Sequence, residues 1–348
     1  MTSKSTSEVP AFLRQSRGDL HSKFVDLEWK QRNRLAQGSQ DAATSGDSKF
    51  ARLAGDHITS RNRYLNVEPF AQNRIKLKVG EGVNDYINAS PIKLGERYYI
   101  ATQGPKDTSV THFYRMLKSE IKGPAVVVML TQTFESGKEK CFQYYPLTKQ
   151  DSPLDVPRDE ESGDGFTGTV ELISTEEAST SRTQIRKLKL HTKTDDGSTE
   201  EKDITHLLFS GWPDFLVPEG ENRTALIRLV QLSARFNAGH STPTDAPTTD
   251  DAMSKDLSGT EQDNPRIIHC SAGVGRSGTF IALDYLLGQL HSGKFDRLPA
   301  NRDPVAETVD SLRQQRMMMV QGESQFNFLY EVLREQFEAR QQSKQTAA

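Results

Sequence analysis

The chain has 348 residues, of which 34% are hydrophobic and 26% are charged, and its formal net charge is -3. This length is typical of one large or two ordinary globular domains. So small a net charge excludes a general attraction to nucleic acid or to a membrane surface, so any anion must be bound by a local site. The chain starts with polar residues, and none of its apolar runs approaches the ~20 residues of a membrane-spanning helix.

The two cysteines, Cys141 and Cys270, lie far apart in the sequence, and because the chain starts with polar residues we expect no secretory leader. We therefore expect both thiols to be free in a reducing compartment. A cytoplasmic protein follows from this expectation, with the nucleus as a further location.

The expected elements mix helices and strands, and the chain starts with a flexible tail at residues 1–18. Apolar residues at helical spacing, among them Leu20, Phe24 and Leu27, predict a helix at residues 19–36, followed by a polar loop at residues 37–47. Strands are expected at residues 86–89, 98–101, 125–130, 168–172, 185–191 and 204–209. Further helices are expected at residues 107–121, 222–236, 277–290, 305–315 and 325–341, before a short tail at residues 343–348. The pattern indicates an α/β or α+β fold.

Two polar segments interrupt this pattern. Residues 149–165 are rich in Asp, Glu, Pro and Gly, and residues 239–264 are rich in Ser, Thr, Asp and Pro. Both are too polar to bury much surface, so we expect solvent-exposed, mobile insertions. The second insertion comes directly before a short strand at residues 266–268, which favours a loop within one domain over a domain boundary.

The most informative segment follows that strand. Residues 269–280 read His-Cys-Ser-Ala-Gly-Val-Gly-Arg-Ser-Gly-Thr-Phe, and a helix begins within them. A strand, a glycine-containing loop and a helix N-terminus together make an anion site, because successive peptide N–H groups can turn inward around phosphate oxygens. The residues that would supply these groups are Ser271, Ala272, Gly273, Val274 and Gly275.

Three side chains of the same segment suit phosphate chemistry. Arg276 can bind two phosphate oxygens at once. An electropositive loop favours the thiolate of Cys270, which is the reactive form. Ser277 can donate a hydrogen bond to that sulfur when it becomes the leaving group. A buried structural cysteine beside a turn is the competing interpretation of Cys270, and the full string argues against it.

This loop resembles the signature of the cysteine-dependent protein tyrosine phosphatases, in particular the non-receptor, tyrosine-specific members. The resemblance covers about residues 50–338, with the main motifs in the family's order. It implies one phosphatase domain over residues 19–342, with a highly twisted mixed β-sheet flanked by helices. The polar insertions resemble those of fungal members.

The resemblance also implies a general acid. Trp212-Pro213-Asp214 follows a predicted strand and is similar to the family's acid loop, in which a carboxylic acid protonates the leaving phenolate. Asp214 is the expected acid, and Trp212 the expected anchor of the loop. An ordinary Pro-Asp turn is the alternative interpretation.

Two more segments resemble loops that shape the pocket. In residues 62–67, Tyr64 would stack on the substrate ring, and Asn66 stands where the family has Asp. Near the C-terminus, Gln321 would place the water that hydrolyses phosphocysteine, and Gln325 would help to hold phosphate. A tyrosine packed at a loop edge and two glutamines capping a helix are the competing interpretations.

Three supporting residues complete the expected site. Glu135 resembles the residue that braces the phosphate-loop arginine, and Lys140 the lysine beside the acid, although a solvated charge pair would have the same sequence pattern. His269, directly before the cysteine, is expected to support it.

We therefore expect an enzyme that hydrolyses phosphotyrosine in proteins, kinases among them, and that regulates signalling. The alternatives are a pseudophosphatase that binds phosphotyrosine without turnover, and a dual-specificity or phosphoinositide phosphatase. Tyr64 argues against the last two, because a deep pocket excludes shorter phosphoresidues. No cofactor is expected, and no metal is required, because no His/Asp cluster accompanies the site.

Overall fold

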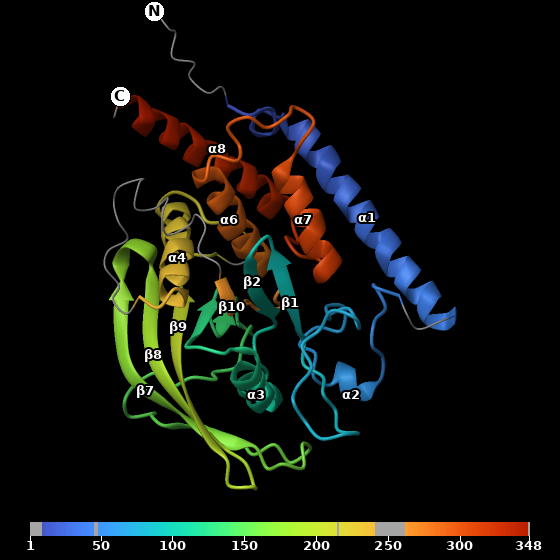
Figure 1. Ribbon diagram of the computed structural model, residues 1–348, viewed down its shortest axis with the longest axis vertical. Coiled ribbons are helices and arrows are strands. Elements are labelled where there is room, and N and C mark those ends of the chain that lie inside the picture. Colours follow the sequence, from blue (N-terminus) through green and yellow to red (C-terminus); the bar gives the residue numbers. More distant parts are fainter. Residues whose placement is uncertain (1–8, 45–47, 214–215, 241–261, 347–348) are drawn as a thin grey trace, which may run out of the picture.

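The computed structural model describes residues 9–44, 48–213, 216–240 and 262–346. An eight-stranded twisted sheet runs through it in the order β1-β2-β10-β3-β9-β8-β7-β6 (Figure 1). The strands are β1 (Ala89–Leu94), β2 (Arg97–Thr102), β3 (Ala125–Met129), β6 (Leu154–Val156), β7 (Thr167–Ala178), β8 (Thr183–Lys193), β9 (Thr199–Phe209) and β10 (Gln262–His269). The pairs among β2, β10, β3 and β9 are parallel, and the outer pairs are antiparallel. A separate hairpin joins β4 (Phe134–Glu135) to β5 (Lys138–Glu139).

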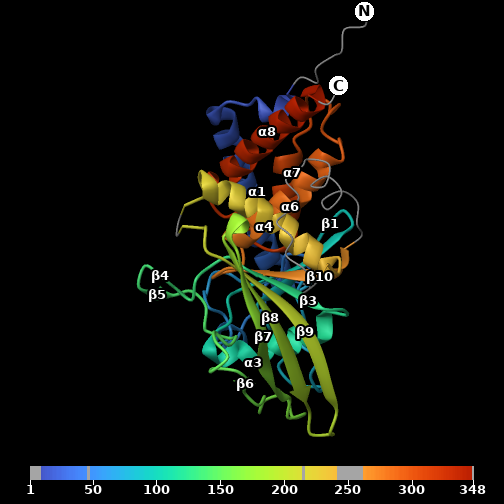
Figure 2. The ribbon, with the colours of Figure 1, turned by 90° about the vertical axis from the view of Figure 1, so that its left-hand side faces the viewer.

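Helices cover both faces of the sheet. The helical segments are η1 (Ala11–Leu13), α1 (Arg17–Thr44), α2 (Asp56–Thr59), η2 (Asp107–Ser109), α3 (Val110–Glu120), η3 (Ser179–Ser181), α4 (Glu221–Asn237), α6 (Gly275–His291), α7 (Pro304–Gln315) and α8 (Glu323–Thr346). Figure 2 shows α4, α6, α7 and α8 on one side of the sheet and α3 on the other. The chain thus forms the mixed α/β architecture that the sequence predicted.

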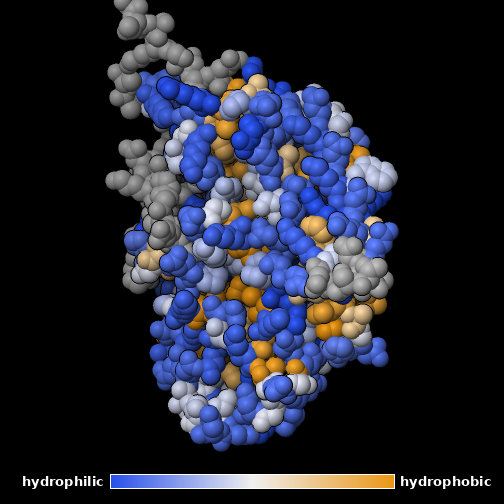
Figure 3. Space-filling model, turned by 45° about the vertical axis from the view of Figure 1, so that its right-hand side comes forward, coloured by the Kyte–Doolittle hydropathy of each residue, from blue (hydrophilic) through white to orange (hydrophobic). Residues whose placement is uncertain are grey.

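Two apolar cores lie on the two faces of the sheet. Successive residues of β3 alternate between them, because Val126 and Val128 pack with α4 and α6, whereas Val127 and Met129 pack with α3. A central strand that is buried on both faces reads as an unbroken apolar run. The surface is mainly hydrophilic on the face shown in Figure 3, with apolar residues in small patches.

The N-terminal segments differ from the expectation. Phe12 and Leu13 are buried, and Phe12 packs edge-on against Phe295, so part of the expected tail belongs to the core. Helix α1 runs on through most of the expected loop at residues 37–47. Gly38 explains why, since a side chain there would lie 2.2 Å from the carbonyl oxygen of Phe50. Glycine lets the two backbones approach and seats the helix despite its polar composition.

Three further expectations need correction. The strand expected at residues 86–89 is only an isolated bridge at Tyr86, and pairing in the sheet begins at Ala89. Helix α8 continues to Thr346, through most of the expected C-terminal tail. Of the second insertion, residues 241–261 lie outside the described residues, and β10 begins at Gln262.

The first expected insertion, at residues 149–165, is held by the core of the molecule. Strand β6 pairs with β7, and Arg115 of α3 donates hydrogen bonds of 2.7 Å to both carboxylate oxygens of Asp164. Asp159 lies 3.1 Å from the same guanidinium group. Two of the acidic residues that suggested a solvated loop, Asp159 and Asp164, are therefore the partners of a buried arginine.

Candidate active site

The loop between β10 and α6 has the shape of an anion cradle. Gly273 has a φ of +73°, and a side chain there would lie 2.2 Å from the carbonyl oxygen of Thr102. Only glycine fits this left-handed, closely packed position. The N–H of Gly273 points to the Sγ atom of Cys270, at 3.3 Å. The loop therefore turns at least this peptide N–H toward the cysteine.

Arg316 holds the outer side of the loop, and the sequence interpretation missed it. Its guanidinium group is fully buried and donates to the carbonyl oxygens of Gly273 at 2.9 Å and Ala272 at 3.1 Å. Because C=O and N–H point in opposite directions in a trans peptide, these bonds aim the N–H groups of Gly273 and Val274 at the other side of the loop. Burial lowers the pKa of Arg316 to about 10, so it stays charged at neutral pH and adds positive charge near Cys270.

Arg276, at the start of α6, is braced by Glu135 of the β4–β5 hairpin. Two parallel hydrogen bonds of 2.7 Å join the two side chains, and Arg276 also donates to the carbonyl oxygen of Leu130 at 3.0 Å. Burial alone would raise the pKa of Glu135, but its hydrogen bonds, led by those from Arg276, outweigh burial and lower that pKa. Glu135 is thus an anion at neutral pH, and it fixes the direction of the arginine fork.

Most of the predicted site residues meet around one cavity of about 310 Å³. Its lining comes from segments that are far apart in the sequence: Tyr64, Asn66, Val67, Glu135, Lys140, Cys270, Ser271, Ala272, Gly275, Arg276, Gln321 and Gln325. The phosphate-loop cysteine and arginine lie in the same cavity as the tyrosine and both glutamines. A phosphorylated aromatic ring could therefore contact all of these groups at once.

Tyr64 is tied to the phosphate loop. Its hydroxyl lies 2.8 Å from Oγ of Ser271, which in turn donates to the carbonyl oxygen of Lys140 at 2.9 Å. Arg63, in the same loop as Tyr64 (residues 62–67), donates hydrogen bonds to the carbonyl oxygens of Gly104 and Pro105 and so anchors this loop. These contacts fix the ring of Tyr64 as one wall of the cavity.

The two glutamines lie against the start of α6. A side chain added at Gly275 would lie 3.1 Å from Nε2 of Gln325 and 3.3 Å from Oε1 of Gln321. Gln325 also accepts a hydrogen bond of 3.3 Å from the N–H of Gly322. Both amide groups are therefore close to the phosphate loop, as a role in handling phosphate and water requires.

His269 is buried behind the cysteine. Its Nδ1 lies 3.2 Å from the carbonyl oxygen of Cys270, and its Nε2 lies 2.7 Å from the hydroxyl of Tyr144. Burial lowers the pKa of His269 to about 4, so the ring is neutral at physiological pH. This arrangement suits a residue that positions the loop and not one that exchanges protons with substrate.

The acid loop is only partly described. Trp212 is buried, and its Nε1–H donates to the carbonyl oxygen of Leu216 at 3.1 Å. Asp214, the expected general acid, lies outside the described residues. Ser277 directly follows Arg276, and its buried hydroxyl has no hydrogen-bond partner among the described residues. The bond that we expect from it belongs to the step in which the sulfur of Cys270 leaves.

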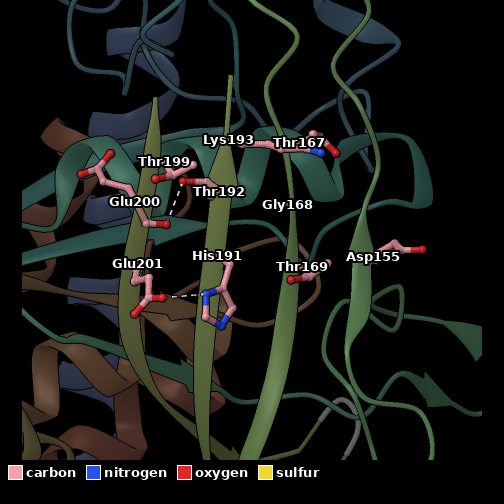
Figure 4. A pocket seen from close by; sticks show the side chains of 10 residues that line it. All are labelled: Asp155, Thr167, Gly168, Thr169, His191, Thr192, Lys193, Thr199, Glu200 and Glu201. Atoms are coloured by element: carbon pink, nitrogen blue, oxygen red, sulfur yellow. Dashed lines mark hydrogen bonds and ion pairs between the residues drawn. The ribbon is translucent and has the colours of Figure 1, made fainter. Parts of the chain in front are cut away.

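A second and larger hollow lies elsewhere. It has a volume of about 770 Å³ and is lined by Asp155 and by residues of β7, β8 and β9 (Figure 4). His191 lies there, 3.1 Å from a carboxylate oxygen of Glu201. Lys193 and Thr199 lie at one end of the β8–β9 hairpin, and Phe209 lies at the other end. The phosphate loop follows β10, which runs parallel to β3 and β9, so this loop lies at the Phe209 end of the sheet, away from the hollow. No residue of the predicted site lines this hollow.

The described part of the chain holds no cluster of three or more His, Cys, Asp or Glu side chains that could bind a metal ion. Over the same residues, no helix has both the length and the apolar character to cross a membrane.

Comparison with solved structures supports the fold. The crystal structure of the catalytic domain of human protein tyrosine phosphatase non-receptor type 18 has a TM-score of 0.68 and 24% identity, and the match covers 94% of this chain and 99% of that one. A structure titled as PTPN18 in complex with HER2-pY1196 phosphor-peptides has a TM-score of 0.69 and 25% identity, over 91% and 93% of the two chains.

Similar sequences come from fungi and animals. Tyrosine-protein phosphatase 1 of Saccharomyces cerevisiae is 31% identical over 348 residues, which cover 92% of this chain and 95% of that protein. Tyrosine-protein phosphatase 2 of Schizosaccharomyces pombe is 32% identical over 90% of this chain, which spans only 39% of that longer protein. Phosphatidylinositol phosphatase PTPRQ of Rattus norvegicus is 31% identical over 94% of this chain and 11% of its own length.

The family model described as protein-tyrosine phosphatase matches residues 58–335, which include every predicted site residue. Together with the fold, this match shows that the chain belongs to the protein-tyrosine phosphatase family, the enzymes that remove phosphate from phosphotyrosine.

Proposed function

We propose that this chain hydrolyses phosphotyrosine in proteins through a phosphocysteine intermediate on Cys270. The observation that carries the proposal is the single cavity lined by Cys270, Arg276, Tyr64 and Gln321. A nucleophile, an anion-binding fork, an aromatic wall and a water-positioning amide are the groups that this reaction needs.

In the first step, the loop N–H groups and Arg276 bind the phosphate oxygens. The thiolate of Cys270 attacks phosphorus, the bond from phosphorus to the phenolic oxygen breaks, and Asp214 donates a proton to that oxygen. The products of this step are a free tyrosine side chain and phosphocysteine. Positive charge from Arg276 and from buried Arg316 favours the negative charge on the transferred group.

In the second step, Gln321 positions a water molecule against phosphorus while Gln325 helps to hold the phosphate. Asp214, now a carboxylate, takes a proton from that water. The new bond to oxygen forms as the bond to sulfur breaks, and Ser277 donates a hydrogen bond to the departing thiolate. Inorganic phosphate leaves, and the starting enzyme is restored.

Specificity for phosphotyrosine would come from the depth of the cavity above Cys270. Tyr64 stands as a wall above Ser271 of the phosphate loop, so the phosphate of a substrate must reach past this ring. Phosphoserine and phosphothreonine are shorter than phosphotyrosine and would not reach Cys270. Lys140 and Asn66, which both line the cavity, would contact the peptide.

The expected partners are phosphotyrosine proteins, with tyrosine kinases among them, and the expected role is the regulation of signalling in the cytoplasm or nucleus. One relative is named as a phosphatidylinositol phosphatase, so lipid substrates need a direct test. Residues 271–275 of this chain have no lysine that would favour a polyanionic inositol head group.

The test compares wild type, Cys270→Ser and Asp214→Ala on phosphotyrosine, phosphoserine and phosphoinositide substrates. Wild type should release phosphate from phosphotyrosine peptides at least about 100-fold faster than from the other two, and Cys270→Ser should be inactive. Asp214→Ala should bind phosphotyrosine proteins without turnover and so capture the natural substrate from extract. Binding without turnover by wild type would instead indicate a pseudophosphatase, and faster lipid hydrolysis would overturn the substrate assignment.

A further inference from the structure

Helix α1 contacts the segment that carries Gln321. The family match begins at residue 58, whereas α1 ends at Thr44, so this helix lies outside the matched region. It packs against α7 and α8 (Figure 1). The turn between these two helices holds the residues that precede Gln321.

That turn has an unusual backbone. Met318 has a φ of +61° and Val320 a φ of +55°, although neither is glycine. A β-branched residue in the left-handed region is an outlier, and such conformations persist only where the surroundings determine them. The orientation of Gln321, the next residue, therefore depends on the groups that hold residues 318–320.

Hydrogen bonds from three directions hold this turn. The Oε1 atom of Gln31 on α1 accepts from the N–H of Met318 at 2.7 Å. Arg313 of α7 donates to the carbonyl oxygens of Met319 at 3.0 Å and Val320 at 2.9 Å. The N–H of Val320 donates to Val274 of the phosphate loop at 3.2 Å.

Helix α1 also holds the arginine. Glu28, one helical turn before Gln31, accepts a hydrogen bond of 2.8 Å from Arg313, whose side chain is fully buried. Gln31 itself is only 7% exposed, so its bond to Met318 is largely protected from competing water. Two neighbouring residues of one helix face thus reach the turn, one directly and one through Arg313.

We propose that Gln31 and Glu28 are positioning residues that hold Gln321 in place for the hydrolysis of phosphocysteine. The inference rests on the proposed role of Gln321 in the second step. The first step depends on Cys270 and Arg276, and Arg276 is held from another side by Glu135 and Leu130. Loss of the α1 contact should therefore slow the second step selectively.

The experiment is rapid-mixing kinetics with an aryl phosphate that has an acidic leaving group. Gln31→Met removes the acceptor while nearly keeping side-chain volume. The burst of phenol release should keep its wild-type rate within about twofold, while steady-state turnover falls about three- to tenfold and phosphoenzyme accumulates. Acid quenching followed by mass measurement of Cys270 reports the phosphoenzyme directly.

Two variants serve as controls. Gln31→Glu keeps an acceptor at the same position and should restore most of the turnover. Arg34→Met removes the ion pair of 2.7 Å between α1 and Asp310 of α7, so it weakens the docking of α1 without touching the turn. It should leave both steps unchanged. Should Gln31→Met fail to fold, Glu28→Gln provides the same test through Arg313.

The outcomes distinguish failure of the positioning role from failure of the proposed function. If the Gln31 and Glu28 variants slow both steps equally, or neither, the positioning role is wrong while the phosphocysteine mechanism stands. If Arg34→Met slows the second step as much as Gln31→Met, helix docking and not the contact at Met318 explains the effect, which also overturns the inference. If wild type forms no phosphoenzyme and Cys270→Ser keeps its activity, the proposed function itself fails.

Discussion

The guanidinium group of Arg276 and the carboxylate of Glu135 face each other through two hydrogen bonds of 2.7 Å. The arginine lies at the start of α6, directly after the phosphate loop, and the glutamate lies in a hairpin more than a hundred residues earlier. Their pairing fixes the guanidinium group where it lines the cavity. It also makes the anion-binding geometry depend on a residue that does not itself need to touch phosphate.

Glu135→Gln should weaken catalysis more than stability. An amide cannot form the pair of charge-assisted hydrogen bonds that the carboxylate makes with Arg276. Losing about 1.5 kcal/mol of transition-state stabilisation corresponds to a roughly tenfold decrease in kcat/KM. Steady-state kinetics on a phosphotyrosine peptide checks this. Lys138→Gln, on the exposed part of the same hairpin, is the matched control. Equal activity of the Glu135→Gln variant and wild type would show that the brace is dispensable.

The same pair has a pH signature in stability. The pKa of Glu135 is lower in the folded protein than its ordinary value of 4.5, so its stabilising effect is fully present above that value. It is lost as the pH falls through the folded-state pKa. Urea unfolding of wild type and Glu135→Gln should therefore give different free energies at pH 7, with the difference shrinking below about pH 4.5.

Asp284→Asn should cause a large loss of stability. Asp284 is fully buried between Arg266 at 2.6 Å and Arg97 at 2.8 Å. Burial would raise the pKa of Asp284, but the two arginines outweigh it and lower the pKa to about 2. Removing this charge leaves two arginines without a counter-ion, which costs about 3–5 kcal/mol. Urea unfolding measures the loss.

The control for this variant is Glu338→Gln, which removes an exposed pair with Arg334 and should change the free energy of unfolding by less than about 0.5 kcal/mol. A similar small effect of Asp284→Asn would show that the buried cluster relaxes or takes up water.

Peroxide should inactivate the enzyme through Cys270 alone. Cys270 lines the open cavity, whereas Cys141 is fully buried and burial raises the pKa of its thiol, which keeps it protonated and inert. Dithiothreitol should restore most of the activity, and bound phosphate or vanadate should protect. Peptide mapping checks the site, and oxidation of Cys141 with Cys270 still reduced would contradict this assignment.

Asn66→Asp should improve the use of peptides. Asn66 is exposed at the rim of the cavity, where an anion would accept peptide N–H groups more strongly than an amide. A gain of about 1 kcal/mol is a several-fold rise in kcat/KM on phosphopeptides. p-Nitrophenyl phosphate has no peptide backbone and should be unaffected. An equal rise on both substrates would place the effect in the catalytic step.

The parts of the molecule that the sequence predicted well are those with dense local signals. The strand predicted at residues 125–130 is apolar at every position because both faces of the sheet are covered, and it is one residue shorter in the structure. The phosphate loop is recognisable because its glycines, cysteine and arginine lie within a few residues and all serve to bind one phosphate group. The family match covers this loop.

The parts that escaped prediction depend on long-range partners. Arg316 contacts carbonyl oxygens more than forty residues away, and nothing beside it in the sequence reveals that contact. Gly38 stays helical because Phe50 packs against it, although its neighbours are polar. Gln31 binds a backbone N–H that is 287 residues distant. In each case the tertiary partner decides a structure that local composition leaves open.

Met318→Gly should favour peptides with two neighbouring phosphotyrosines. Met318 lies three residues before Gln321, whose side chain lines the cavity, and we expect the partly buried Met318 side chain to narrow the space beside the cavity for a second phosphotyrosine. We therefore expect wild type to prefer doubly over singly phosphorylated peptides only weakly. Glycine adopts a φ of +61° with less strain than methionine, which stabilises the folded state, but it also has more conformational freedom in the unfolded chain. The two effects on the free energy of unfolding should offset each other to within about 1 kcal/mol.

This variant also distinguishes an effect of the Met318 side chain on peptide binding from an effect on the turn that holds Gln321. The N–H that Gln31 binds belongs to the backbone, so it remains in the glycine variant, and turnover of p-nitrophenyl phosphate should stay near the wild-type rate. Kinetics on single and tandem phosphopeptides gives the preference directly. An unchanged ratio of the two kcat/KM values in Met318→Gly would show that the methionine side chain does not limit this side of the cavity.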